Sequence, residues 1–245
     1  MTNKSLSQPT LDLINDYQNL EIGGKKINTP YFNNCRSQVR AGLRVLIGKG
    51  TPKDIAEEAL ILSLREKVEL DKMSGEEITK FLVDHNIGID CSGFVYHILN
   101  TELKSQNKKS LNKVIRRPWV KNPLRKMIAK LRSVENTGVS TFGNPANSTK
   151  VNLDNIQPGD MITMINTGSD HNIHHVLLVY KIENKTIHYV HSFKYSEDGQ
   201  YNHGIKKESL EITDPTKSLL EQKWQEPRML EHARQAQELK IVRIK

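Results

Sequence analysis

The chain has 245 residues, a net charge of +8 at pH 7 and an apolar fraction of 36%, which suits one large domain or one domain with a sizeable insertion. No stretch approaches the roughly 18 consecutive apolar residues of a membrane helix, and the first twenty residues lack the apolar run and cleavage site of a secretion signal. We therefore expect no transmembrane segment, and a protein that is either cytoplasmic or released by a non-classical route.

The first half of the chain is expected to be helical, because apolar residues recur there at helical spacing. Thr51-Pro52 places a cap before a proline, and Ser74-Gly75-Glu76-Glu77 is a capping box. The predicted helices cover about Leu11–Leu20, Cys35–Ile47, the residues after Thr51, the stretch from Ser74 to about Asp84, and the stretch after Cys91. Cys35 follows only Asn33-Asn34, so we expect it to be a plain structural residue.

A basic segment follows. Between Thr101 and Glu135 there are eleven Lys or Arg residues and two acidic residues, a local net charge of +9, so the rest of the chain sums to −1. Residues from about 104 to 150 look like an insertion or a long mobile connection, with a basic helix at about Asn122–Arg132. The stretch Lys104–Arg132 is either a site for an anionic polymer or membrane surface (wall polymers, phospholipid headgroups or nucleic acid) or a solvated loop with ordinary lysines.

The second half turns to strands. Short runs rich in β-branched and aromatic residues predict strands at Met161–Ile165, Val176–Ile182, Thr186–His191 and Leu239–Ile244. Helices followed by antiparallel strands indicate an α+β fold. We expect a single domain over residues 1–245, with a helical N-terminal extension over about residues 1–73 and the basic insertion at about residues 101–150.

The motif Asp90-Cys91-Ser92-Gly93 carries the sharpest chemical signal. A cysteine at the start of a helix faces unpaired backbone amides and the positive end of the helix dipole, which favour the nucleophilic thiolate. The amide of Cys91 can donate to a developing oxyanion. Asp90 either caps the helix or orients a substrate amine, Ser92 lies in the first turn, and Gly93 leaves room for a substrate backbone. These three are the expected substrate-binding residues.

Two histidines can complete the site. His175 opens a predicted strand and His191 ends the next one, with Glu183-Asn184-Lys185 as the turn between them. A three-residue loop sets His175 opposite Phe193 and His191 on the same face, at a diagonal of roughly 7–8 Å. A two-residue loop puts the two histidines on opposite faces. In the first register Cys91, His175 and His191 can converge as nucleophile, base and base-orienting group.

Three blocks give the chain a family resemblance: Asp90-Cys91-Ser92-Gly93-Phe94-Val95, then Gln157-Pro158-Gly159-Asp160 before a strand, then His175-Val176 with His191 closing the following strand. Together they resemble the NlpC-type cysteine peptidases, the NlpC and p-sixty group, over roughly residues 89–100 and 155–191. The resemblance implies a papain-like core in which the cysteine helix packs on a small antiparallel β-sheet. It also implies Cys91 as nucleophile, His175 as base and His191 as the third polar residue.

The same resemblance implies the reaction. Such enzymes cut peptide or amide bonds in peptidoglycan stem peptides or muropeptides, often next to a γ-linked D-glutamate. The expected route is a thioester, with no cofactor and no metal. The chain departs from the family pattern where a tyrosine and a Gly-Gly pair often stand about a dozen residues before the cysteine, since Thr79-Lys80-Phe81 occupies that region.

Other interpretations remain open. His171, His174 and His175 with Asp170 are possible zinc ligands, although adjacent strand residues point to opposite faces. A second alternative is a papain-like binding module whose basic insertion holds an anionic surface, with little or no catalysis. A third is an amidase or acyltransferase on the same core. The order of Cys91 before His175 favours the peptidase arrangement.

Overall fold

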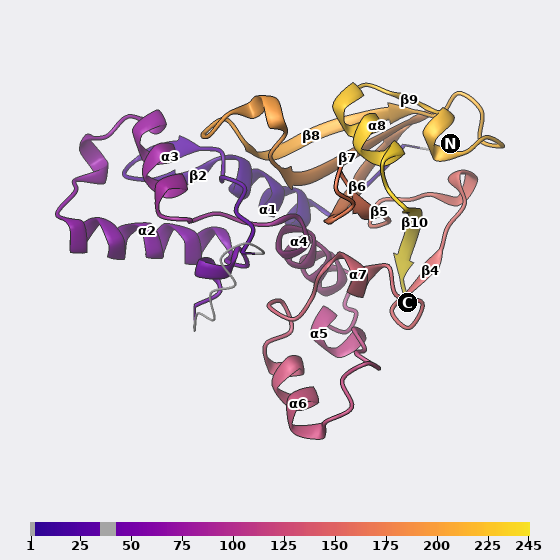
Figure 1. The fold of residues 1–245 in the computed structure, drawn as a ribbon, viewed down its shortest axis with the longest axis horizontal. Coiled ribbons are helices and arrows are strands. Elements are labelled where there is room, and N and C mark those ends of the chain that lie inside the picture. The colour runs from indigo at the N-terminus through magenta and orange to yellow at the C-terminus, as the bar shows by residue number, and fades with distance from the viewer. Residues whose placement is uncertain (1–2, 35–42) are drawn as a thin grey trace.

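The computed structural model describes residues 3–34 and 43–245. In these ranges the helices are α1 (Gln8–Gln18), α2 (Pro52–Glu66), α3 (Gly75–Asp84), α4 (Cys91–Ser105), α5 (Leu111–Val114), α6 (Pro123–Leu131), α7 (Val139–Phe142) and α8 (Pro227–Arg234). The strands are β1 (Lys4–Ser5), β2 (Leu20–Ile22), β3 (Lys25–Ile27), β4 (Ser148–Lys150), β5 (Met161–Thr167), β6 (Ile173–Glu183), β7 (Thr186–Phe193), β8 (Gly204–Glu211), β9 (Lys223–Trp224) and β10 (Glu238–Ile244). Figure 1 shows α2 and α3 at one end, the main sheet at the other, and α4 between them.

The main sheet is antiparallel. Within the described ranges it has eight strands, in the order β4-β10-β5-β6-β7-β8-β9, with β1 added alongside β6. The predicted α+β class and the packing of the cysteine helix on an antiparallel sheet are confirmed. The sheet is larger than expected, because β1, β4, β8 and β9 join the four strands that the sequence predicted. Strands β2 and β3 form a separate hairpin.

The starts of α2 and α3 follow from their capping residues, as the sequence predicted. Thr51 Oγ1 accepts the backbone N–H of Asp54 at 3.2 Å, and the Asp54 carboxylate accepts the N–H of Thr51 at 2.8 Å. Ser74 and Glu77 make the same reciprocal pair at 3.2 and 2.7 Å. These side chains satisfy amides that have no partner inside the helix.

Helix α4 is held firmly in the core. It packs against β6 and β7 on one side and against α1 on another, and Phe94 and Ile98 are fully buried. At its far end, Glu102 accepts hydroxyl hydrogen bonds from Ser7 at 2.6 Å and Thr10 at 2.8 Å, which tie α4 to α1. These contacts fix α4 in the core and with it the position of its first residue, Cys91.

The Gln157–Asp160 block forms the corner before β5. Gly159 adopts φ 93, a conformation that favours glycine. The Asp160 carboxylate makes two contacts with the Arg243 guanidinium, at 2.6 and 2.8 Å, and so ties this corner to β10. The motif thus positions the central strands of the sheet.

The remaining predicted segments differ from the structure in places. Residues 35–42 of the predicted helix Cys35–Ile47 lie outside the described residues, and the rest contains only a 3-10 turn at Val45–Ile47. The expected insertion contains α5, α6, α7 and β4, and β4 pairs with β10. Helices α5 and α6 project from the body of the molecule (Figure 1). Among the described helices, none is long and apolar enough to span a bilayer.

Candidate active site

Cys91 is the first residue of α4 and lies against β6. The Asp90 carboxylate accepts the backbone N–H of Gly93 at 2.6 Å, so Asp90 is the N-cap of the helix. Cys91 Sγ lies 3.9 Å from the backbone oxygen of His174 and contacts the backbone amide of Val176. Because these two groups belong to the neighbours of His175 on the strand, the thiol lies beside the backbone of His175.

The β6–β7 hairpin has a two-residue turn. Glu183 pairs with Thr186, so only Asn184 and Lys185 make the turn. Asn184 adopts the left-handed conformation, at φ 53, that asparagine tolerates in tight turns. Of the two loop lengths that the sequence left open, the two-residue loop is therefore the one observed. A two-residue turn alone would put the two histidines on opposite faces.

A β-bulge on β6 nevertheless brings the two histidines to the same face of the sheet. The pairing slips between Val179 and Lys181, which leaves Tyr180 outside the β6–β7 register. Continued past the bulge, this register sets His175 opposite Phe193, and the two ring centroids are 4.4 Å apart. His191 lies on the same face, and its Nδ1 is 2.9 Å from His175 Nε2.

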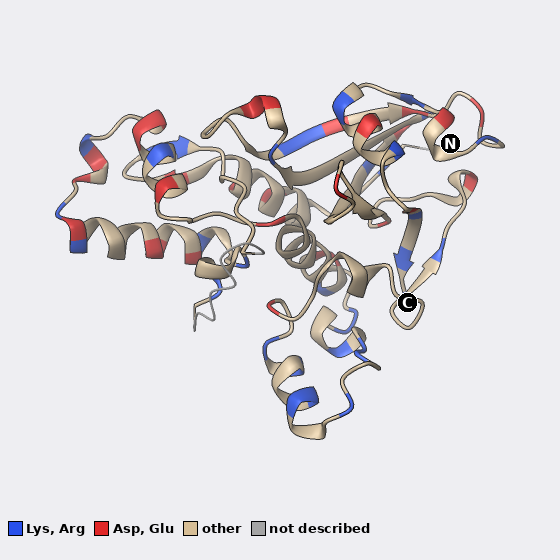
Figure 2. Ribbon diagram, viewed as in Figure 1, with Lys and Arg blue, Asp and Glu red and all other residues tan. Residues whose placement is uncertain are grey.

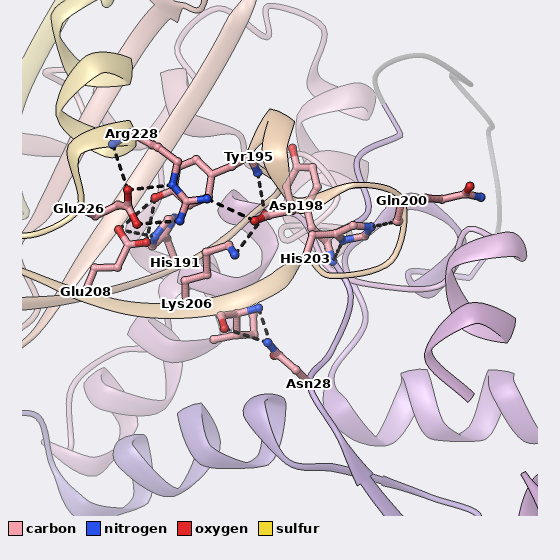
Figure 3. Close-up of polar contacts among 12 residues, drawn as sticks. Asn28, His191, Tyr195, Asp198, Gln200, His203, Lys206, Glu208, Glu226 and Arg228 are labelled. Carbon is pink, nitrogen blue, oxygen red and sulfur yellow. Dashed lines mark hydrogen bonds and ion pairs between the residues drawn. The ribbon is translucent and has the colours of Figure 1, made fainter. Parts of the chain in front are cut away.

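Behind His191 lies Glu208 of β8, which the sequence-based prediction missed. Glu208 Oε2 is 3.2 Å from His191 Nε2, a contact that is close but not well aligned. The carboxylate also accepts the hydroxyls of Tyr189 at 3.0 Å and Tyr195 at 2.8 Å. Figure 3 shows it among side chains from β7, β8 and the start of α8. Burial alone would raise the pKa of Glu208, but His191 and the two tyrosines outweigh burial and lower it.

The position of Glu208 favours one pair of tautomers for His191 and His175. A carboxylate can only accept, so the neutral tautomer of His191 that suits it carries Nε2–H and keeps Nδ1 as an acceptor. His175 then donates from Nε2 to His191 and keeps the lone pair on its own Nδ1. Proton positions follow here from the hydrogen-bonding partners. His175 Nδ1 is thus the atom that can take a proton from a thiol.

Cys91 and His175 are both held in their neutral forms. Burial, and then the negative charge of Asp90, raise the pKa of Cys91 to about 12, although a nearby lysine and backbone amides act in the opposite direction. Burial, followed by repulsion from two neighbouring histidines, lowers the pKa of His175 well below 6.5. The thiolate expected from the helix start is therefore not the resting form, because excluding water disfavours both charges.

A buried lysine, also missed from the sequence, lies at the start of α4. Lys49 Nζ is 2.8 Å from the Asp90 carboxylate, 2.6 Å from Ser92 Oγ and 3.3 Å from the backbone oxygen of Thr137. Lys49 and Asp90 are each 7% exposed. Ser92 also donates to Asp90 at 3.1 Å. The polar atoms of Asp90 and Ser92 are therefore engaged by groups of the chain itself.

Gly93 faces the chain's own backbone. A Cβ at this position would lie 2.8 Å from the backbone oxygen of Gly48 and 2.9 Å from Cδ of Lys49. These groups occupy the room that we expected a substrate backbone to use. The absence of a side chain at Gly93 instead lets the segment that carries Lys49 approach the first turn of α4.

Cys91 opens onto a cleft of about 1180 Å³. Its walls come from the start of α4 and from segments before and after it in sequence, and they include Tyr31, Asn33, Asn34, Ile47, Lys49, Glu135, Thr137–Val139, Ser169–Asp170, Asn172–His174 and Phe193–Ser196. A tyrosine from far upstream thus lines the cleft. A second hollow, of about 670 Å³, lies among residues 150–154, 215–220 and 239–241 and includes none of the predicted site residues.

The other histidines lie around this core in different roles. His174 and His171 are exposed, and their rings bond to the backbone of Asn166. Within the described ranges, no group of three or more His, Cys, Asp or Glu side chains is arranged to hold a metal ion. His232 of α8, which the sequence did not single out, has its ring 4.9 Å from that of Phe193 and 5.9 Å from that of His175.

A family model matches most of the chain. The NlpC/P60 family model covers residues 72–229, which is more than half of the sequence and includes Cys91, His175, His191 and Glu208. No curated protein and no solved structure matches the chain significantly.

Proposed function

Because the chain belongs to the NlpC/P60 family, whose members are cysteine peptidases and amidases acting on cell-wall peptides, we propose that it hydrolyses a peptide or amide bond in peptidoglycan stem peptides or muropeptides. Cys91 is the nucleophile, His175 the base and His191 the group that orients the base. The observation that carries the proposal is that the Cys91 thiol, at the start of α4, lies against the β6 backbone beside His175, whose ring contacts His191 and through it Glu208.

The reaction begins with proton transfer from Cys91 to His175 Nδ1 as Sγ attacks the carbonyl carbon. Transfer accompanies attack, because the thiol and the imidazole are both neutral at rest. The backbone amide of Cys91 donates to the oxyanion. The C–N bond then breaks, the His175 imidazolium returns its proton to the leaving amine, and a thioester remains. Water that loses a proton to His175 attacks this thioester, releasing the carboxylic acid and the thiol.

The contacts behind the His175 ring stabilise the imidazolium that forms when His175 takes up a proton. His175 Nε2–H is held by His191 at 2.9 Å, and His191 Nε2 faces the Glu208 carboxylate at 3.2 Å. A fixed negative charge at the end of this line stabilises the transient imidazolium and keeps the ring oriented. Glu208 is a positioning residue in this scheme, since it reaches the reacting atoms only through His191.

Lys49 links the residues at the start of α4 to substrate binding. Asp90 and Ser92 contribute to substrate binding through the Lys49 ammonium, because their polar atoms are already engaged by it. Gly93 contributes by letting this lysine approach. A free substrate amine gains little from Asp90 in this arrangement.

The test is turnover of defined muropeptides by the full chain, with mass spectrometry of the products. Cys91→Ala is expected to lower kcat/KM by at least about 10⁴-fold, and His175→Ala by a similar factor. His171→Asn is the matched control, because this exposed histidine is not among the residues that line the cleft and asparagine tolerates its left-handed backbone conformation, and it should retain activity. Circular dichroism checks that each variant is folded. Turnover that survives Cys91→Ala would sink the proposal.

Glu208→Gln tests the positioning line separately. The side chain keeps its size but loses its charge, so kcat should fall about 10–100-fold with little change in KM, and the acid limb of the pH–rate profile should move to lower pH. Glu211→Gln on the same strand, where the carboxylate meets exposed Lys223, should leave kcat and the profile unchanged. An unaltered kcat in Glu208→Gln would remove Glu208 from the mechanism.

The alternative is a papain-like binding module with little or no catalysis. It predicts that the wild-type chain leaves muropeptides intact across the pH range, and that its binding is indifferent to Cys91→Ala. The buried, partnered state of His175 and His191 favours the enzyme, because buried polar groups are costly to keep without a use.

A further inference from the structure

The face of α6 that points away from the molecule is apolar. Leu124, Met127, Ile128 and Leu131 follow the spacing i, i+3, i+4 and i+7, so they share one side of the helix. We call these four residues the apolar stripe, and their exposed fractions lie between 46% and 72%. The buried residue of α6 is Ala129, on the opposite side. The helix therefore turns its small side inward and its large apolar side outward.

This orientation is held by a rigid stem. Arg117, 6% exposed, precedes α6 and donates to groups that follow it: the backbone oxygen and hydroxyl of Ser133 at 2.9 and 3.0 Å, and the Thr137 hydroxyl at 2.9 Å. Val134, just after the helix, is also buried. Because these hydrogen bonds hold the segments before and after α6 together, α6 presents its apolar stripe as a fixed surface.

Cations surround the apolar stripe. Lys121, Arg125, Lys126 and Lys130 are exposed, and helical spacing places Arg125 on one side of the stripe and Lys130 on the other. Trp119, 50% exposed, lies just before the helix. Figure 2 shows basic residues distributed over the projecting α5–α6 region. Large apolar side chains flanked by Lys and Arg, with a nearby tryptophan, are typical of helices that lie in a membrane interface.

We propose that α6 and Trp119 dock on the surface of an anionic lipid bilayer. The acyl boundary would cover the apolar stripe while the headgroups neutralise the surrounding cations. A soluble anionic polymer or nucleic acid would neutralise the cations but leave the apolar stripe exposed to water. A second copy of this chain would bring two segments of like charge together, since residues 101–135 carry +9.

Docking in this way orients the candidate active site. The chain that leaves α6 runs directly into the cleft wall, where Glu135 and Thr137–Val139 line the space in front of Cys91. Docking of α6 would therefore tether the bilayer to the segment that continues into the cleft wall. The docking stands independently of the proposed hydrolysis, because it rests on α6 and its stem alone.

Vesicle flotation of the full chain tests the proposal. Binding is expected to vesicles of phosphatidylcholine with phosphatidylglycerol, with little binding to phosphatidylcholine alone, and it should weaken as salt is raised. Tryptophan emission should shift to shorter wavelength on binding, and Trp119→Phe should remove that shift. The double variant Leu124→Gln with Leu131→Gln should weaken partitioning by at least about tenfold.

A matched control lies on α2. Leu60 and Leu64 are 54% and 71% exposed, close to the 61% and 72% of Leu124 and Leu131, but Glu57 and Glu66 share their helix. Leu60→Gln with Leu64→Gln should leave partitioning unchanged. The proposal is overturned by absence of vesicle binding, by equal binding to both vesicle types, by equal losses in the two double variants, or by vesicle binding that is indifferent to the α6 variant.

Discussion

The candidate active site and α6 differ from ordinary protein interiors and surfaces in opposite ways. His175 and His191 are polar and are 1% and 0% exposed, whereas Leu124 and Leu131 are apolar and are 61% and 72% exposed. The buried polar groups are compensated inside the fold, because each has a partner within 3.2 Å. The apolar groups of α6 have no such cover within the described ranges. The two regions thus differ in whether the fold itself supplies partners for their side chains, as it does in the candidate site and does not on the apolar stripe.

Among changes to the candidate site, the largest loss of folding stability is expected at Lys49. Lys49→Met leaves the Asp90 carboxylate buried without its cation, and breaking a buried ion pair in this way costs about 3–5 kcal/mol of folding stability. Urea unfolding measures the loss. The double variant Lys49→Met with Asp90→Asn should recover part of it, because the uncompensated charge is gone. A Lys49→Met variant as stable as wild type would mean that the pair contributes nothing to the fold.

Acid should lower the folding stability through His232, a largely buried histidine beside the candidate site. Burial, and then repulsion from His191, lower the pKa of His232 to about 4 from 6.5. As pH falls below 6.5 the unfolded chain takes up this proton first, so stability is present above pH 6.5 and is lost down to about pH 4, by about 3 kcal/mol. Unfolding curves at pH 7.5 and 4.5 measure it. His232→Leu should lose less between the two pH values, and an equal loss would exclude His232 as the source.

The smallest effect is expected on α6. Leu124→Gln with Leu131→Gln should change the free energy of unfolding by less than about 0.5 kcal/mol, because these side chains are exposed and glutamine is a good helix former. Thermal unfolding of the purified chain measures it. A loss above about 1.5 kcal/mol, the lower end for fully burying an apolar side chain, would show that the stripe packs within the fold, and the contrast with the candidate site would disappear.

Much of the helical framework could be predicted because its signals are local. The capping residues Thr51, Ser74 and Asp90 each lie within three residues of the amide that they accept. The placement of Cys91 at a helix start follows from Asp90 in the same way. The four predicted strands also carried local signals, in the form of short β-branched and aromatic runs.

The features that escaped prediction depend on distant or backbone geometry. Strand β8 has four polar residues in a row, Lys206 to Ser209, so it lacks the alternation that would mark it, and Glu208 was missed with it. Lys49 reaches Asp90 only in the folded chain. The pKa of Cys91 follows from burial, which a helix-start argument cannot supply.

The bulge at Tyr180 is one extra residue on the β6 side of the hairpin, and the pairing of the two strands can do without it. The β6 side holds one residue more than the two-residue turn needs to keep His175 and His191 on one face. A relative could therefore lose a residue between His175 and the turn, or gain one between the turn and His191, simply by straightening the strand. The opposite length changes would need a second bulge. Length variation in this hairpin should accordingly be tolerated in one direction, and the histidine pair is protected against that class of insertion and deletion.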